Sequence, residues 1–346
     1  MYRKDAIVVG EWIRNSNKAL LVTGARQTGK TWLIRDEIEK SGYTKFELNF
    51  IDQPDMVSYL NAEMSAEEFL IKLKMIMPED CKVHETVVFF DEIQKCPEIV
   101  TKIKFLVDEG SFKYVMSGSL LGVELKGIAS APVGYLTVLR MYPMDFEEFM
   151  VANNVSTTTL DMLEDKFKTV SPIEEFIHQK LLAMFFVYLI VGGMPDAVKT
   201  YIETKDIREV DRVQRDITTL YKEDFSQYEL EDRKLKLKSI YDIIPAELDK
   251  QNKKFVFTML NKELKFERYE NSFLWLKDAG VALPVYNVYA PVIPLLASKS
   301  SNVFRLFSSD IGLLTSAYPA ETKIELINKN GEVNNGAHFE NAVAQP

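Results

Sequence analysis

A stretch of eight residues near the start of the chain has the residue types and spacing of a phosphate-binding loop. It runs from Gly24 to Thr31 and fits the pattern G-x-x-x-x-G-K-[ST] at every position. In such a loop the glycines let backbone N–H groups converge on phosphate oxygens, and the positive end of the following helix adds to the attraction. We expect Lys30 to reach the β- and γ-phosphates of ATP and the Thr31 hydroxyl to ligate Mg²⁺. The predicted nucleotide-binding residues are Gly24, Ala25, Arg26, Gln27, Thr28, Gly29, Lys30, Thr31 and Trp32.

A second motif places two carboxylates directly after an apolar run. Residues 86–90 suit a buried strand, and Asp91 and Glu92 follow at its carboxyl end, where ligands bind in parallel α/β sheets. We expect Asp91 to hold Mg²⁺ through its waters and Glu92 to accept a proton from the water that attacks the γ-phosphate. Successive strand residues point to opposite sides, so the two carboxylates can serve different partners. The pair alone would suggest a solvated strand end, but its position after the phosphate loop favours the chemical role.

A third polar group, Ser117-Gly118-Ser119, follows another predicted strand at 112–116. In ATPases with an extra strand between the phosphate-loop strand and the Asp-Glu strand, a polar residue at this tip senses the γ-phosphate. Ser117 or Ser119 could fill that role, although Ser-Gly-Ser is also ordinary turn chemistry. The predicted catalytic residues are Glu92, Lys30 and Ser117, and the predicted metal ligands are Thr31 and Asp91.

Alternating strands and helices must position these groups. Strands are predicted at 19–22, 45–50, 86–90, 112–116 and 135–141, and helices at 5–18, 31–38 and 69–73, from Pro97 and from Pro143. A capping box, Ser65 to Glu68, opens the third of these helices. This alternation is typical of a parallel α/β sheet.

The longest apolar run, 181–191, is shorter than the roughly 18 residues that cross a bilayer. We predict a buried helix that is capped by Ser171, with Pro172 in its first turn, and that ends at Gly192. No charged and then apolar leader opens the sequence, so no membrane association is expected and a cytoplasmic protein is predicted.

Composition sets broad limits. A chain of 346 residues that is 47% apolar and 27% charged has room for two to four domains. Its net charge of −9 restricts any nucleic-acid contact to a local patch. The two cysteines, Cys81 and Cys96, indicate no disulfide framework, and no zinc or serine-hydrolase motif is present.

Together the motifs resemble one family: the bacterial and archaeal AAA-type ATPases whose ATPase core is followed by a conserved C-terminal domain of unknown function. The matching segments cover nearly the whole chain and are 24–31, 90–94, 117–119, 142–149, 192–198, 310–314 and 336–344. The resemblance implies an α/β P-loop NTPase of the AAA+ type with sheet order 5-1-4-3-2, a helical lid, a winged helix and the start of a restriction-endonuclease-like domain. The expected boundaries are 1–150, 151–228, 229–290 and 291–346.

Two departures from the family pattern limit what carries over. Many relatives have a Gly-Arg pair after the sensor segment, where this chain has Ala131 to Tyr135, so Arg140, Arg212 and Arg215 are unassigned candidates for a sensor or finger. The family also continues well past Pro346, so the nuclease-like domain is expected to be truncated.

Three functions remain open at this point. The first is an ATP-hydrolysing switch or motor that binds ATP and ADP and can assemble with copies of itself. The second is a nucleotide-gated, initiator-like DNA-binding protein. Residues 231–280 carry 11 Lys or Arg against 9 Asp or Glu, and 233–238 is the most basic run. A winged helix can, however, also serve as a unit for protein packing. The third is a small-molecule kinase, which the Asp91-Glu92 pair disfavours because it suits activation of water.

Overall fold

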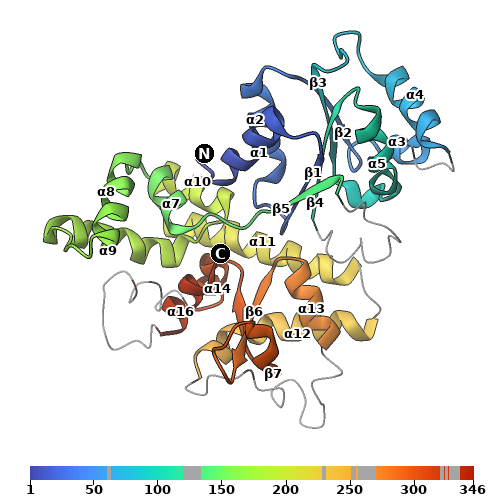
Figure 1. Ribbon diagram of the computed structural model, residues 1–346. Helices are drawn as coiled ribbons and strands as arrows, with labels where there is room; N and C mark the ends of the chain where they lie inside the picture. Colours follow the sequence, from blue (N-terminus) through green and yellow to red (C-terminus); the bar gives the residue numbers. More distant parts are fainter. Residues whose placement is uncertain are drawn as a thin grey trace. The chain divides into compact units, whose positions relative to one another are not determined.

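The computed structural model describes residues 1–60, 64–119, 134–227, 231–250, 255, 270–319, 323, 326 and 336–346. The chain forms two compact units (Figure 1). One is Arg3–Tyr142, and the other combines Pro143–Pro346 with Met1–Tyr2. We describe each unit by itself.

The N-terminal unit is built on a parallel sheet of five strands. These are β1 (Ala19–Thr23), β2 (Thr44–Asn49), β3 (Thr86–Asp91), β4 (Lys113–Gly118) and β5 (Leu136–Arg140). Their order is β2-β3-β4-β1-β5, which confirms the predicted 5-1-4-3-2 arrangement. In this order β1 pairs with both β4 and β5, so the chain leaves β1 from the interior of the sheet and not from its edge.

Helices cover both faces of this sheet, and the strand sequences show why. Along β3 the side chains of Val87 and Phe89 enter one apolar cluster, while Val88 and Phe90 enter the other. Because both faces are buried, the strand is apolar throughout rather than alternating. The helices are α1 (Asp5–Asn15) and α2 (Lys30–Ser41) on the first face, and α3 (Pro54–Leu60), α4 (Ala66–Ile76) and α5 (Glu98–Glu109) on the second.

Local signals account for the helix boundaries of this unit. The capping box predicted at Ser65 and Glu68 is present at the start of α4. In contrast, α1 ends at Asn15 and not at the predicted residue 18. There the indole Nε1 of Trp12 donates to the carbonyl of Lys18, 2.7 Å away, so the chain turns back onto the helix before β1.

The C-terminal unit is mainly helical and carries one antiparallel ribbon, β6 (Ala282–Val288) paired with β7 (Lys299–Ser308). A short 3₁₀ turn, η5 (Leu295–Ser298), lies between the two strands. The helices are α7 (Phe146–Ala152), α8 (Thr157–Lys168), α9 (Glu175–Val191), α10 (Pro195–Thr204), α11 (Ile207–Gln227), α12 (Glu231–Leu248), α13 (Glu270–Asp278), α14 (Ile311–Ser316) and α16 (Gly336–Ala344). Between α12 and α13, residues 251–269 lie outside the described residues except Phe255, so the winged helix expected at 229–290 stays a prediction.

Two predicted helix starts in this unit are wrong. The long apolar helix α9 begins at Glu175, and its N-cap is Glu174, which makes no side-chain cap bond. Ser171 lies upstream of it and accepts a hydrogen bond from the Thr169 hydroxyl. Pro143 does not start α7, because Asp145 and Glu148 form a capping box two residues later. No helix among the described residues is both long and apolar enough to cross a membrane.

Two motifs that support the family resemblance meet inside this unit. The carboxylate of Asp310 caps α14 and accepts a hydrogen bond of 2.6 Å from the backbone N–H of Gly193, 117 positions earlier. A Cβ on Gly312 would lie 2.4 Å from the carbonyl oxygen of Val191, so α14 and the end of α9 approach each other at backbone distance. These motif glycines are therefore needed for close packing.

Candidate functional site

The phosphate loop connects β1 to α2 through three residues in left-handed or related conformations. Gly24, Gln27 and Gly29 have φ values of 146°, 63° and 89°. A Cβ on Gly24 would lie 2.1 Å from the carbonyl oxygen of Met141, so only glycine fits there. Gly29 is the N-cap of α2, which places the first N–H groups of that helix at the loop. Strand, glycine turn and helix N-terminus are thus arranged as the motif predicts.

Lys30 lies inside this loop and is only 7% exposed. Its Nζ donates to the carbonyl oxygens of Gly24 and Ala25, at 3.1 and 2.6 Å. Burial lowers the pKa of Lys30 to about 8, and the negative charges of Glu92 and Asp91 limit that shift. The lysine is therefore held within the loop with its positive charge facing the two carboxylates.

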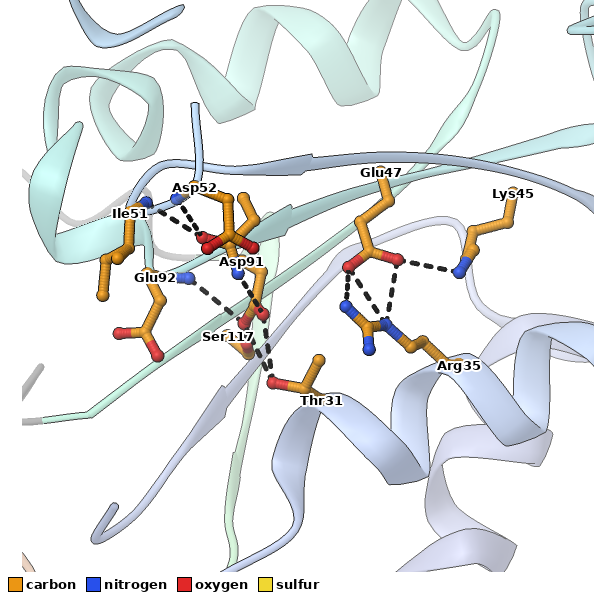
Figure 2. Close-up of polar contacts among 10 residues, drawn as sticks. Thr31, Arg35, Lys45, Glu47, Ile51, Asp52, Asp91, Glu92 and Ser117 are labelled. Atoms are coloured by element: carbon orange, nitrogen blue, oxygen red, sulfur yellow. Dashed lines mark hydrogen bonds and ion pairs between the residues drawn. The ribbon is translucent and has the colours of Figure 1, made fainter. Parts of the chain in front are cut away.

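Asp91, at the end of β3, is the centre of a buried hydrogen-bond network (Figure 2). The Thr31 hydroxyl lies 3.1 and 3.2 Å from its two oxygens, and the Asn49 amide donates to Oδ2 at 3.1 Å. The Ser117 hydroxyl donates to Oδ1, as does the backbone N–H of Glu92. The structure therefore brings together three predicted residues, Thr31, Asp91 and Ser117. Their oxygen atoms form a donor set that suits Mg²⁺.

Asn49 is a member of this network that the sequence analysis missed. It ends β2, next to β3 in the sheet, with Asn49 in register with Asp91. Its side-chain oxygen also accepts from the backbone N–H groups of Ile51 and Asp52 (Figure 2). The available signal was its position, a polar residue at the carboxyl end of a predicted strand.

The geometry of Glu92 differs from the prediction. Strand β3 ends at Asp91, and Glu92 has the left-handed φ of 56°, so the alternation of strand side chains does not apply to the pair. A turn directs the Glu92 carboxylate away from Asp91, and the amide of Gln94 donates to it. The two carboxylates still face different partners, but a change of backbone conformation is the cause.

The second serine of the Ser-Gly-Ser tip has a different environment from the first. Ser117 bonds Asp91, whereas the Ser119 hydroxyl accepts from the Arg26 guanidinium at 3.4 Å and from the Gln94 amide at 3.5 Å. Both serines are buried, at 0% and 1% exposure. The tip of β4 therefore contacts Asp91 through Ser117 and the phosphate loop through Ser119.

An ion pair fixes α2 against the neighbouring strand. Arg35 on α2 and Lys45 on β2 both bond the Glu47 carboxylate, with Arg35 Nε at 3.0 Å and Lys45 Nζ at 2.8 Å (Figure 2). Burial acts to raise the pKa of Glu47, and the hydrogen bonds from Arg35 and Lys45 outweigh it, so the pKa is lowered. This contact orients the helix whose N-terminus forms the phosphate loop.

The other predicted residues are more peripheral. Trp32 is 45% exposed, and Ala25 and Thr28 are buried in the loop, where the Thr28 hydroxyl donates to the Ala25 carbonyl at 3.0 Å. Arg140 lies on β5 beside the Tyr142 ring, at 5.5 Å from its centroid. On α11 of the C-terminal unit, Arg212 pairs with Glu209, and Arg215 pairs with Asp211. Residues 131–133 lie outside the described residues.

Two parts of the chain match known domain families. Residues 16–150 match the family model of an AAA domain, and residues 183–324 match a family described as a domain of unknown function. No curated protein matches the chain. Among solved structures, the chain resembles the Walker-type ATPase PABY2304 of Pyrococcus abyssi at 12% identity and a TM-score of 0.52, covering 91% of this chain and 95% of the other. Cdc6p of Pyrobaculum aerophilum matches at 13% identity and a TM-score of 0.31, covering 93% and 92%.

Proposed function

We propose that this protein binds ATP with Mg²⁺ and hydrolyses it as a switch or motor, because residues 16–150 match the family model of an AAA domain and carry a parallel sheet of the order expected for a P-loop NTPase. The observation that supports this most strongly is the contact between the Thr31 hydroxyl and the Asp91 carboxylate, 3.1 Å apart. It joins the end of the phosphate loop to the acidic strand end, where a nucleotide-bound metal ion is held in this class of enzyme.

Each residue of the site has a role in this proposal. The backbone N–H groups of residues 24–31 and the Lys30 ammonium bind phosphate oxygens. Trp32 follows the loop in the first turn of α2, where its side chain is exposed. Thr31 and Asp91 would hold Mg²⁺, which neutralises the phosphate charge. Asn49 and Ser117 orient Asp91 through their hydrogen bonds to its carboxylate. From its position beside Asp91, Ser117 also senses the γ-phosphate.

Glu92 is the general base of the proposed reaction. Its carboxylate accepts the proton of a water molecule as that water attacks the γ-phosphorus, and the products are ADP and inorganic phosphate. The left-handed turn separates this carboxylate from Asp91, so one acidic group serves the metal ion while the other is free to act as a base.

The test is the variant Glu92→Gln, which keeps size but cannot accept a proton. We expect ATP affinity within about twofold of the unaltered chain and a loss of hydrolysis of at least about 100-fold. The matched control is Glu39→Gln on the exposed side of α2, which should hydrolyse ATP normally. Hydrolysis at the unaltered rate in the Glu92 variant would remove Glu92 from this role.

The C-terminal unit would convert the nucleotide cycle into movement or binding. We assign residues 151–228, which contain α8 to α11, to a helical lid domain. Residues 229–290, with α12, α13 and β6, are assigned to a winged helix, and residues 291–346 to a nuclease-like domain.

Duplex DNA has less support as the partner. The connection between β6 and β7 presents apolar side chains to solvent, with Val292, Ile293 and Leu296 at 66%, 90% and 78% exposure. A ribbon that contacted phosphates would carry Lys or Arg there. ATPase rates measured with and without DNA, and over a range of protein concentrations, separate a DNA-stimulated motor from an enzyme activated by self-association. Detection of a phosphorylated acceptor in place of free phosphate would favour a kinase.

A further inference from the structure

Gln94 lies two residues after the proposed base and is 7% exposed. It belongs to the short 3₁₀ turn η1 (Ile93–Lys95), whose N-cap is Glu92 in the left-handed conformation. This turn reverses the chain immediately after β3 and brings the side chain of Gln94 back onto that of Glu92. Gln94 is not among the predicted site residues, and the proposed ATPase mechanism does not use it.

The contacts of Gln94 are specific. Its Nε2 donates to Oε2 of Glu92 and also lies 3.5 Å from the Ser119 hydroxyl. The charge of Glu92 determines which way the amide faces, because an ionised carboxylate can only accept hydrogen bonds. One carboxylate oxygen of Glu92 is therefore occupied by a donor, and the other is left to accept a proton. A side chain fixed in this way loses less conformational freedom when it reacts.

Ser119 extends the contact to the phosphate loop. Its hydroxyl lies 3.4 Å from Nε of Arg26, so Arg26, Ser119, Gln94 and Glu92 form a continuous series of polar contacts. The series runs from the loop that surrounds the phosphates, across the tip of β4, to the end of β3. The backbone N–H of Glu92 joins this series to the network of Thr31, Asn49 and Ser117 around Asp91.

We propose that Gln94 is a positioning residue of the ATPase, which holds the Glu92 carboxylate in place for proton transfer and links it through Ser119 to Arg26 of the phosphate loop. This inference rests on the proposed function of Glu92. Gln94 acts through Glu92, so its removal lowers the rate of the chemical step and leaves nucleotide binding intact. A hydrogen bond to a charged group of this kind corresponds to about 10- to 100-fold in rate.

The experiment compares Gln94→Ala with the unaltered chain, using ATP and Mg²⁺. We expect kcat to fall about 10- to 100-fold while KM and the affinity for a fluorescent ATP analogue stay within about twofold. Gln94→Glu is isosteric but has no N–H donor, so it should lose at least as much activity as Gln94→Ala. It also serves as the second variant if the alanine substitution prevents folding, which thermal unfolding checks. The matched control is Gln179→Ala on the exposed side of α9, where the amide likewise donates to a glutamate, Glu175, at 2.7 Å.

A double-mutant cycle separates positioning from a general structural effect. In the Glu92→Gln background there is no base to position, so adding Gln94→Ala should change the residual single-turnover rate by less than about twofold. Radiolabelled ATP makes that slow rate measurable.

The outcomes distinguish the two proposals. If the unaltered chain does not hydrolyse ATP, or Glu92→Gln hydrolyses it normally, the proposed function fails. If hydrolysis depends on Glu92 but Gln94→Ala keeps its kcat or gains activity, the role of Gln94 is refuted. It is equally refuted if the loss caused by Gln94→Ala is undiminished in the Glu92→Gln background.

Discussion

The hydroxyl oxygen of Thr31 lies 3.1 Å from Oδ2 of Asp91, although 60 positions separate the two residues. Thr31 belongs to the first turn of α2, and Asp91 ends β3. They meet because parallel strands present their carboxyl ends at one edge of the sheet, where the helix after β1 also begins. Asn49 reaches the same carboxylate from the neighbouring strand.

This contact predicts how the protein depends on magnesium. Asp91→Asn removes the negative charge from the metal site while keeping the shape of the side chain. We expect the gain in ATP affinity that Mg²⁺ provides to shrink about tenfold or more, and hydrolysis to be lost. Titration of a fluorescent ATP analogue with and without Mg²⁺ measures this, with Asp108→Asn on the exposed face of α5 as the control. An unchanged magnesium dependence would show that Asp91 does not hold the metal ion.

The buried Lys30 predicts a pH dependence of nucleotide binding. Its pKa is lowered to about 8, chiefly by burial, and only the charged form attracts phosphate. Affinity should therefore be nearly constant up to about pH 7 and weaken as the pH rises through about 8 and beyond, because the free protein loses the proton that the complex requires. Lys30→Ala should bind ATP about 100-fold or more weakly and show no such decline. Lys40→Ala, on the exposed side of the same helix, is the control. Affinity that stays flat to pH 10 would contradict the prediction.

The close approach of α14 and α9 predicts a large stability effect from a single methyl group. Gly312→Ala would place a Cβ 2.4 Å from the Val191 carbonyl oxygen and 2.6 Å from Nε2 of Gln214. We expect it to reduce the free energy of unfolding of the C-terminal unit by about 1–3 kcal/mol or more. Urea unfolding followed by tryptophan fluorescence measures the change, since Trp275 is buried in that unit. For comparison, Gly42→Ala meets no atom within 4 Å and should cost only its left-handed strain, about 1 kcal/mol. Equal effects would argue against the steric explanation.

His338 predicts sensitivity to acid in the same unit. Its ring is 1% exposed beside Tyr318, neither nitrogen has a partner among the described residues, and burial lowers its pKa to about 4. Between about pH 6.5 and 4 the unfolded chain binds a proton that the folded chain does not, so this residue costs stability as the pH falls, by up to about 3 kcal/mol. Asp310 acts in the opposite sense, because burial raises its pKa to about 6 and it favours folding as the pH falls through that value.

His338→Leu should therefore flatten the loss of stability between pH 6.5 and 4, as measured by urea unfolding at several pH values. His178→Leu, on the exposed side of α9, should leave the slope unchanged. Each variant removes one titratable imidazole, so comparing the buried His338 with the exposed His178 tests whether burial causes the loss of stability in acid. Equal slopes for His338→Leu and the unaltered chain would show that the buried ring does not control acid stability.

Most of the sequence-based predictions rest on patterns formed by a few adjacent residues. The spacing of Gly24, Gly29, Lys30 and Thr31, and the apolar run that ends at Asp91, were enough to predict the phosphate loop, the acidic strand end and, through the family resemblance, the strand order. These signals are local because a glycine turn, a buried strand and a capping box each depend on a few adjacent residues.

Contacts between distant residues were decided only by the tertiary structure. Asn49 belongs to no motif in the sequence, and it becomes part of the site because strand register brings its amide to Asp91, 42 positions later. Gln94 lies in a matched segment, but only the 3₁₀ turn shows that its amide reaches Glu92. The same holds for Gly193 and Asp310, whose hydrogen bond closes a separation of 117 positions. Residue types determine which turns and strands can form, whereas side-chain partners across the fold depend on packing, which no local pattern encodes.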